Sequence, residues 1–228
     1  VEDIFYTTPR LLIDSPLPES GKTTVLEHIY RFGYRPVQAA LIASPATLAR
    51  MLAEGMRTIL IDEAEKALRP DNPITADLLA ISNSGYKRGG TRPVTTPLSN
   101  GQWTVTEHST FAPVAMAGIS PNLPDDTLSR SIRMMLLPDS EGNVDDSDWE
   151  FIEADAEGLA GRLRDVIGQA AEPIRGYQRP DLPEGVRGRM SEKWRPLLRI
   201  ADVAGGQWPD QARLLIAHEM QIRQLEKD

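Results

Sequence analysis

The sequence contains no cysteine, and only three of its 228 residues are histidine. Disulfides and thiolate metal sites are therefore excluded, and His28, His108 and His218 lack the paired spacing of metal ligands. No apolar run approaches the roughly 20 residues that a membrane helix needs, and no positively charged start precedes an apolar stretch. We therefore expect a cytoplasmic protein with no zinc chemistry and no membrane contact.

The net charge of −8 argues against a uniformly basic nucleic-acid binder, because neutralising phosphates requires clustered Lys and Arg. Residues 139–157 hold nine acids and no Lys or Arg, which is typical of a solvated linker and helix start. Residues 175–199 reverse the balance, with seven Lys or Arg against three acids and a local charge of +4. Basic surface is therefore available locally.

Up to residue 138, short apolar runs alternate with amphipathic stretches, as in parallel sheets whose strands are joined by helices. The predicted strands are 10–14, 36–42, 58–61, 113–119 and 131–137. The predicted helices of this region are 22–32, 44–55 and 75–82. A Gly-, Thr- and Pro-rich excursion follows at 85–102. After Pro138 the pattern changes to helices at 149–171, 184–203 and 209–227. We expect an α/β core of residues 1–138, with a five-stranded parallel sheet, and a helical C-terminal lid domain of residues 139–228.

A phosphate-binding loop is indicated by Ser20-Gly21-Lys22-Thr23, which follows a strand and a turn and opens a helix. Backbone N–H groups at Ser20, Gly21 and Thr24 would face the phosphates of a nucleotide. Lys22 would reach the β and γ oxygens and act in catalysis, and Thr23 would offer its hydroxyl to Mg²⁺. The pattern predicts ATP and Mg²⁺ as cofactors.

The loop departs from the usual motif at Pro16, which stands where the first Gly normally falls. Pro16 and Pro18 lack an N–H, and Glu19 adds negative charge near the phosphates. Weak or unusual nucleotide binding is the alternative that these residues leave open.

The apolar strand over 58–61 ends at two acids, Asp62 and Glu63. Asp62 would join the metal shell, and Glu63 would activate the water that attacks the γ-phosphate; a helix-capping acid is the alternative for Glu63. Such a pair is typical of the additional-strand class of P-loop proteins, in which strand one lies beside strand four. On the exit of strand four, Ser120 or Asn122 would hold the water or the γ-phosphate, unless Ser-Pro-Asn is a simple turn.

Three later segments carry a resemblance to a known family. The pattern from Asn122 to Arg133, with Leu-Pro-Asp followed by Arg-Ser, resembles an actinobacterial and phage domain family of unassigned function that is often described as helicase-like. The likeness continues through Asn83-Ser84-Gly85-Tyr86-Lys87-Arg88-Gly89 and through residues 194–206, ending at Trp208-Pro209. The order of the motifs is also similar to that of superfamily 3 primase-helicases of the AAA+ class.

This resemblance implies a P-loop NTPase fold and roles for two arginines. Arg130 would be an arginine finger that reaches the γ-phosphate of a neighbouring subunit, since a guanidinium suits the charge on the transferring phosphoryl group. Arg189 would be a lid residue that senses the nucleotide, with a solvated helix face as the alternative. For Arg133, a salt bridge that closes the turn into the last strand is an equal alternative to a catalytic role.

A DNA contact is expected between the Asp-Glu strand and the sensor strand. There Tyr86, Lys87, Arg88 and Arg92 stand among glycines, which suits a loop that grips a phosphate backbone and stacks a base. The resemblance implies the same, because superfamily 3 helicases carry their DNA-contacting hairpin at this position. The alternatives are a solvated charged turn and cations that serve a neighbour's nucleotide.

Together these features predict an ATPase motor, a helicase or DNA-remodelling protein of phage- or plasmid-type replication in a bacterial or phage-infected host. It would form a ring-like homo-oligomer such as a hexamer on single-stranded or duplex DNA. The alternative is a nucleotide-controlled assembly or binding module, such as a loader or defence switch, that moves no DNA. A metabolite phosphotransferase is a third reading, and the Asp62-Glu63 pair argues against it. The chain opens on Val1 rather than methionine, which suggests a fragment with flanking domains.

Overall fold

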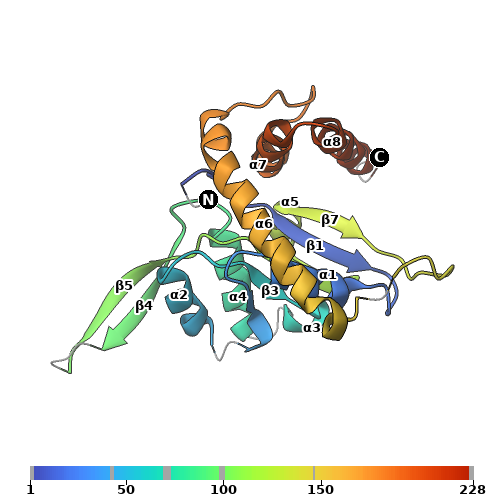
Figure 1. Ribbon diagram of the computed structural model, residues 1–228. Coiled ribbons are helices and arrows are strands. Elements are labelled where there is room, and N and C mark those ends of the chain that lie inside the picture. The colour runs from blue at the N-terminus through green and yellow to red at the C-terminus, as the bar shows by residue number, and fades with distance from the viewer. Residues whose placement is uncertain (1–2, 42–43, 69–72, 98–100, 146, 226–228) are drawn as a thin grey trace.

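The computed structural model describes residues 3–41, 44–68, 73–97, 101–145 and 147–225. Its centre is a parallel sheet in the order β2-β3-β6-β1-β7 (Figure 1). The five strands are β1 (Arg10–Ser15), β2 (Val37–Gln38), β3 (Ile59–Ile61), β6 (Val114–Ile119) and β7 (Ser131–Met135). The predicted α/β class and the five-stranded parallel sheet are confirmed. The first strand lies beside the fourth strand of this sheet, as expected, because β1 pairs with β6 in parallel register.

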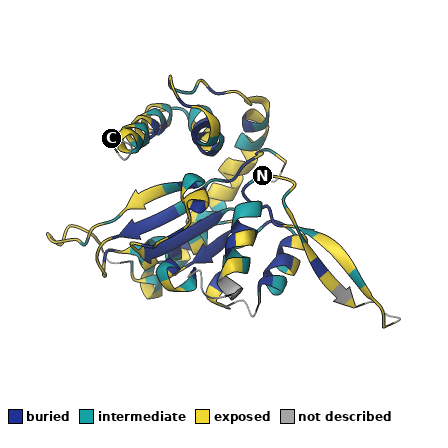
Figure 2. Ribbon diagram, turned by 180° about the vertical axis from the view of Figure 1, so that it is seen from behind, coloured by how far each residue is buried: buried dark blue, intermediate teal, exposed yellow. Residues whose placement is uncertain are grey.

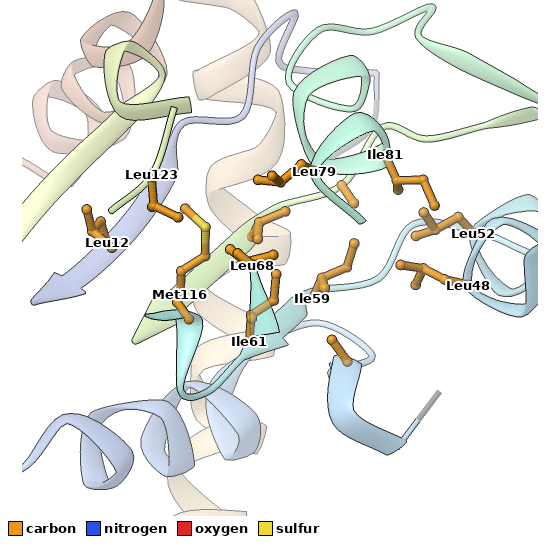
Figure 3. Packing of buried hydrophobic residues seen from close by; sticks show 14 residues of the cluster. Leu12, Leu48, Leu52, Ile59, Ile61, Leu68, Leu79, Ile81, Met116 and Leu123 are labelled. Carbon is orange, nitrogen blue, oxygen red and sulfur yellow. The ribbon is translucent and has the colours of Figure 1, made fainter. Parts of the chain in front are cut away.

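Helices cover both faces of this sheet. They are α1 (Lys22–Phe32), α2 (Pro45–Ala53), α3 (Ala64–Ala67), α4 (Pro73–Ser84) and α5 (Asp125–Ser129), with a 3-10 turn at Ala39–Leu41. Successive strand residues point to opposite faces, so Ile59 and Ile61 pack with Leu48 on the α2 and α4 side (Figure 3). Leu60 packs with Leu26 of α1 on the other face. Because both faces are covered, β3 and β6 are apolar throughout, and the central strands appear largely buried in Figure 2.

The excursion predicted over 85–102 is a different structure. Its second half is β4 (Thr91–Pro97), which pairs in antiparallel register with β5 (Trp103–Ser109) to form a hairpin that projects from the body (Figure 1). The composition of this excursion predicted no strand, whereas residues 91–97 form one. Two prolines are tolerated here, since a two-stranded hairpin has edges where no N–H is needed, and threonine and valine supply the β propensity.

The C-terminal region is helical, as predicted, with α6 (Trp149–Gly176), α7 (Gly188–Ala204) and α8 (Trp208–Leu225). The long helix α6 runs along α1 (Figure 1), where Arg31 pairs with Glu153 at 2.7 Å and Trp149 donates to Glu27 at 2.8 Å. Helices α7 and α8 enclose a hydrophobic cluster of their own around Trp194 and Leu198. Among the described residues, no helix is both long enough and apolar enough to span a lipid bilayer.

Candidate functional site

A pocket lies where three strands of the parallel sheet end. Its volume is about 330 Å³, and it is lined by the loop after β1, the start of α1, the turn after β3 and the end of β6. The lining residues are Pro18, Glu19, Ser20, Gly21, Lys22, Thr23, Thr24, Asp62, Glu63, Glu65, Gly118 and Ile119. Open parallel sheets bind ligands at this edge, beyond the carboxyl ends of the strands.

The predicted phosphate-binding residues all meet in this pocket. Ser20, Gly21, Lys22, Thr23 and Thr24 line it, and the loop passes into α1 through Gly21, whose φ of +79° is accessible to glycine at little cost. The Lys22 Nζ donates to the Leu17 carbonyl at 3.0 Å and to the Ser20 hydroxyl at 2.8 Å. A cation and the N-terminus of an eleven-residue helix therefore face the same space.

Two side-chain oxygens that could bind a metal, from different elements, meet in the same pocket. The Thr23 hydroxyl donates to the Asp62 Oδ2 at 3.1 Å, so the start of α1 and the end of β3 touch at this point. A hydroxyl and a carboxylate are the hard ligands that Mg²⁺ prefers. No group of three or more His, Cys, Asp or Glu side chains in the described part of the chain could hold a metal by itself. The donor set therefore fits a magnesium ion whose other ligands are phosphates and water.

Glu63 has an unusual backbone conformation in the pocket wall. Its φ is +48°, its N–H donates to Asp62 Oδ1 at 2.8 Å, and its carboxylate pairs with Lys66 at 2.5 Å. Glu63 precedes α3, but its side chain makes no capping hydrogen bond, so the alternative of a helix-capping acid is not what the structure shows. The side chain is 61 % exposed and lies beside Asp62, where a carboxylate can accept a proton from water.

The pocket is acidic in spite of its lysine. Glu19, Asp62, Glu63 and Glu65 stand against Lys22, which gives the lining a net charge of −3. An anion as charged as a free nucleotide would meet repulsion here, because like charges in a shared site disfavour each other. A divalent cation bound with the phosphates would reduce that repulsion.

The end of β6 and the first turn of α3 complete the pocket with residues that the sequence did not single out, namely Gly118 and Ile119 from β6 and Glu65 from α3. Ser120 and Asn122, the predicted sensor residues, come directly after β6 and are exposed. The Ser120 N–H donates to the Ser15 carbonyl at 3.1 Å, so the turn is held beside the phosphate loop. The signal for Glu65 was its place three residues after Asp62, on the first turn of α3.

Arg130 lies at the opposite edge of the sheet. It precedes β7, whose first residue Ser131 is in register with Arg10 at the start of β1, whereas the pocket lies beyond the end of β1. Arg130 pairs with Asp126 at 3.1 Å and stacks 5.9 Å from the centre of the Tyr86 ring. It therefore lies away from the pocket of its own chain. Arg133 forms an ion pair with Asp14, as its salt-bridge alternative anticipated.

Arg189 is also remote from the pocket. It pairs with Glu192 at 2.7 Å and lies 5.2 Å from the centre of the Tyr86 ring, on the same edge as Arg130. This position does not bring Arg189 to the pocket of its own chain, so a role as nucleotide sensor stays a prediction. The physical reason is that α7 packs against the starts of the strands, where Lys193 donates to the Ser131 carbonyl at 2.5 Å.

The predicted DNA-contacting residues are engaged within the molecule. Tyr86 is 1 % exposed and cannot stack a base, and burial raises its pKa to about 12. Lys87 pairs with Glu192 at 2.8 Å, and Arg92 pairs with Asp77 at 2.8 Å. Arg88 donates to the Phe5 carbonyl at 2.6 Å. The prediction of a flexible, free loop at this point is therefore corrected: the segment anchors the hairpin and the N-terminal residues to the core.

The C-terminal part of the chain is similar to a known family. The model of a family described as a protein of unknown function (DUF3631) matches residues 142–228. This segment contains α6, α7 and α8, and it includes Arg189 but none of the residues that line the pocket. No curated protein matches the chain. The function of the pocket therefore has to be argued from its geometry.

Proposed function

We propose that this chain is a P-loop ATPase of the AAA+ type that binds ATP with Mg²⁺ in the pocket at the ends of β1, β3 and β6. The observation that carries the proposal is the contact of Thr23 with Asp62 at 3.1 Å beside Lys22. Two motifs that are 39 residues apart in sequence thus supply the two metal ligands of one site. The strand order with β6 between β1 and β3 supports the additional-strand class.

In the proposed hydrolysis each side chain of the pocket has a different role. Lys22 and the N-terminus of α1 would bind the phosphates, while Thr23 and Asp62 would hold a magnesium ion, which would supply charge neutralisation to the phosphates. Glu63, adjacent to Asp62 and 61 % exposed, accepts a proton from the attacking water. Burial of the water by a neighbouring subunit would complete the site.

Arg130 acts between subunits in this proposal. It lies at the opposite edge of the sheet from its own pocket, so it serves the γ-phosphate of a neighbour in a head-to-tail ring. It must first leave Asp126, a partly exposed partner whose ion pair contributes on the order of 1 kcal/mol or less. A second copy is therefore part of the active site.

The resemblance to superfamily 3 primase-helicases supports a motor that acts on DNA. A second candidate is the nucleotide-controlled assembly or binding module, and the engagement of Lys87 and Arg92 in ion pairs favours it. Stimulation of the ATPase rate by single-stranded DNA separates the two. A motor predicts stimulation, and a binding module predicts none.

The test of the nucleotide site is equilibrium binding of Mg-ATP to the wild-type protein and to Lys22→Ala. We expect binding by the wild type and a loss of at least about tenfold in the variant, because Lys22 is the one cation of the pocket lining. Lys87→Ala, which removes a lysine at the other edge of the sheet, is the matched control and keeps wild-type affinity. Equal affinities for all three proteins would refute the assignment of the loop.

A further inference from the structure

Two consecutive backbone N–H groups at the exit of β6 are each held by a carboxylate from another element. The Ile119 N–H donates to Glu65 Oε2 at 3.1 Å, and the Ser120 N–H donates to Asp14 Oδ1 at 3.1 Å. Glu65 belongs to α3, directly after the Asp62-Glu63 turn, and Asp14 belongs to β1, directly before the phosphate loop. The exit of β6 is thus tied on both sides to the two motifs that line the pocket.

The turn at the exit of β6 contains a residue in a strained backbone conformation. Ser120 has a φ of +42°, in the left-handed region that disfavours residues with a Cβ. Of the four non-glycine residues with positive φ in the described chain, Glu19 and Glu63 line the pocket and Ser120 adjoins it. Strained residues persist where the surroundings fix them, and hydrogen bonds to charged acceptors are stronger than neutral ones. The two carboxylates supply that support.

Gly118 shows how closely Glu65 approaches the strand. A Cβ at this position would lie 2.6 Å from Glu65 Oε2, 3.3 Å from the Cβ of Pro121 and 3.4 Å from the Cβ of Ala64. The closest of these atoms is the tip of a flexible side chain, so an alanine here would displace the Glu65 carboxylate more readily than the backbone. The space that Gly118 leaves free is the space that Glu65 occupies.

Asp14 is fixed in its turn by Arg133. Its side chain is 3 % exposed, and its second oxygen accepts from Arg133 Nε at 2.7 Å. Arg133 lies on β7, so Asp14 joins β1, β6 and β7 at one level of the sheet. This leaves Glu65 as the more accessible of the two anchors.

We propose that Glu65 is a positioning residue of the nucleotide site, which together with Asp14 holds the β6 exit against the Asp62-Glu63 turn. Glu65 acts through the backbone of Ile119 and does not take part in the proton transfer. Its loss lets the exit of β6 move away from Glu63, so the water and the γ-phosphate lose their alignment while the phosphate loop stays intact. This inference rests on the proposed function of the pocket.

The test compares Glu65→Ala, Glu65→Gln and Gly118→Ala with the wild type. Glu65→Ala should lower kcat by about 10- to 100-fold, the range for small misplacements of reacting groups. Its dissociation constant for Mg-ATP should stay within about threefold, because binding and positioning are separate. Glu65→Gln keeps an oxygen that accepts from Ile119 and should recover most of the rate. Gly118→Ala should resemble Glu65→Ala, and the double variant should be no slower than Glu65→Ala alone.

A second readout needs no nucleotide. Amide exchange at Ile119, followed by NMR in the free protein, should become on the order of tenfold faster in Glu65→Ala and in Gly118→Ala, since each removes one charge-assisted hydrogen bond. Gly158→Ala is the control, because nothing lies within 4 Å of a Cβ at Gly158 in α6. It should change neither the exchange rate at Ile119 nor kcat.

The outcomes separate this inference from the function on which it rests. Wild-type turnover in Glu65→Ala would overturn the positioning role, as would a Glu65→Gln variant that is no faster than Glu65→Ala. A loss of rate that follows weaker Mg-ATP binding alone would also overturn it. A wild-type protein that neither binds nor hydrolyses Mg-ATP would refute the proposed function itself, whatever the exchange rates show.

Discussion

Lys193 offers the sharpest test of how the helical region is joined to the sheet. Its side chain is 1 % exposed, donates to the Ser131 carbonyl at 2.5 Å and forms an ion pair with Glu219. Glu219 in turn accepts from Trp194 Nε1 at 2.6 Å and pairs with Arg223 at 3.0 Å. One buried cation therefore links α7, α8 and the first residue of β7.

The cost of removing this cation follows from its partners. Breaking a buried ion pair costs about 3 to 5 kcal/mol, because the remaining charge is left without compensation. Glu219 keeps Trp194 and Arg223, so we expect the lower end, about 3 kcal/mol for Lys193→Ala. In a protein of this size that lowers Tm by about 6 to 12 °C. Lys193→Met leaves Glu219 and the Ser131 carbonyl without the same partner but keeps the apolar stem, so it should cost less than Lys193→Ala by the packing of that stem alone.

Urea unfolding followed by circular dichroism measures both losses. Lys87→Ala is the control, because Lys87 is 38 % exposed in its ion pair and should contribute about 1 kcal/mol or less. A loss below about 1 kcal/mol in Lys193→Ala would refute the reasoning, since no buried charge would then have been left uncompensated.

The same residue predicts a pH dependence. Burial lowers the pKa of Lys193 below its ordinary value of 10.5, so the folded protein gives up this proton at a lower pH than the unfolded chain does. Between the two pKa values the unfolded state binds more protons, and the free energy of unfolding therefore rises with pH. Lys193→Met should remove this rise in an alkaline urea series, and an identical pH profile in the variant would contradict the assignment.

The remaining predictions concern the sites. Removing Mg²⁺ with a chelator should abolish ATP binding, because the pocket lining carries a net charge of −3. Calorimetry measures the affinity for ATP without the metal, and an unchanged affinity would contradict this prediction. Arg130→Ala should keep Mg-ATP binding and lose on the order of 10³-fold in turnover. Mixing it with Lys22→Ala should restore part of the rate, and co-assembled mixtures without recovery would count against a shared site. For the double variant Lys87→Ala with Arg88→Ala, we measure how the logarithm of the affinity for single-stranded DNA falls with the logarithm of the salt concentration. The slope should stay within about 0.7 of the wild-type slope, because about 0.7 is the contribution of one phosphate contact. A larger decrease would return this segment to the DNA path.

Residues close together in the sequence were enough to predict some of the helices and strands. The Ser44 hydroxyl accepts from the Thr47 N–H at 3.2 Å with Pro45 at the first helical position, and α2 begins where these residues indicate. The pocket was predictable for a related reason, because the loop after β1 and Asp62 each follow a buried strand. Parallel strands end at one edge, which brings Thr23 to Asp62 without any further information.

The positions of the arginines and of Tyr86 depend on tertiary packing. Charge and glycine content indicated an exposed loop, yet Tyr86 is buried beside Arg10, whose pKa burial lowers to about 9. Arg189 lies on a helix whose place is set by contacts with residues far away in sequence, such as that of Lys193 with Ser131. The spacing from Asp62 places Glu65 near the pocket, but its close approach to Gly118 and Ile119 also depends on how α3 packs against β6.

The turnover of Mg-ATP by wild-type protein and by Glu63→Gln tests the central claim most directly. Phosphate release should be measured per subunit over a range of protein concentrations, since in the proposed mechanism Arg130 of a neighbouring subunit would complete the site. We predict Mg²⁺-dependent hydrolysis that rises with concentration in the wild type, and a Glu63→Gln variant that binds Mg-ATP but turns over at least about 10²-fold more slowly, as for loss of a general base. Equal rates of phosphate release from the two proteins at every concentration would contradict the claim.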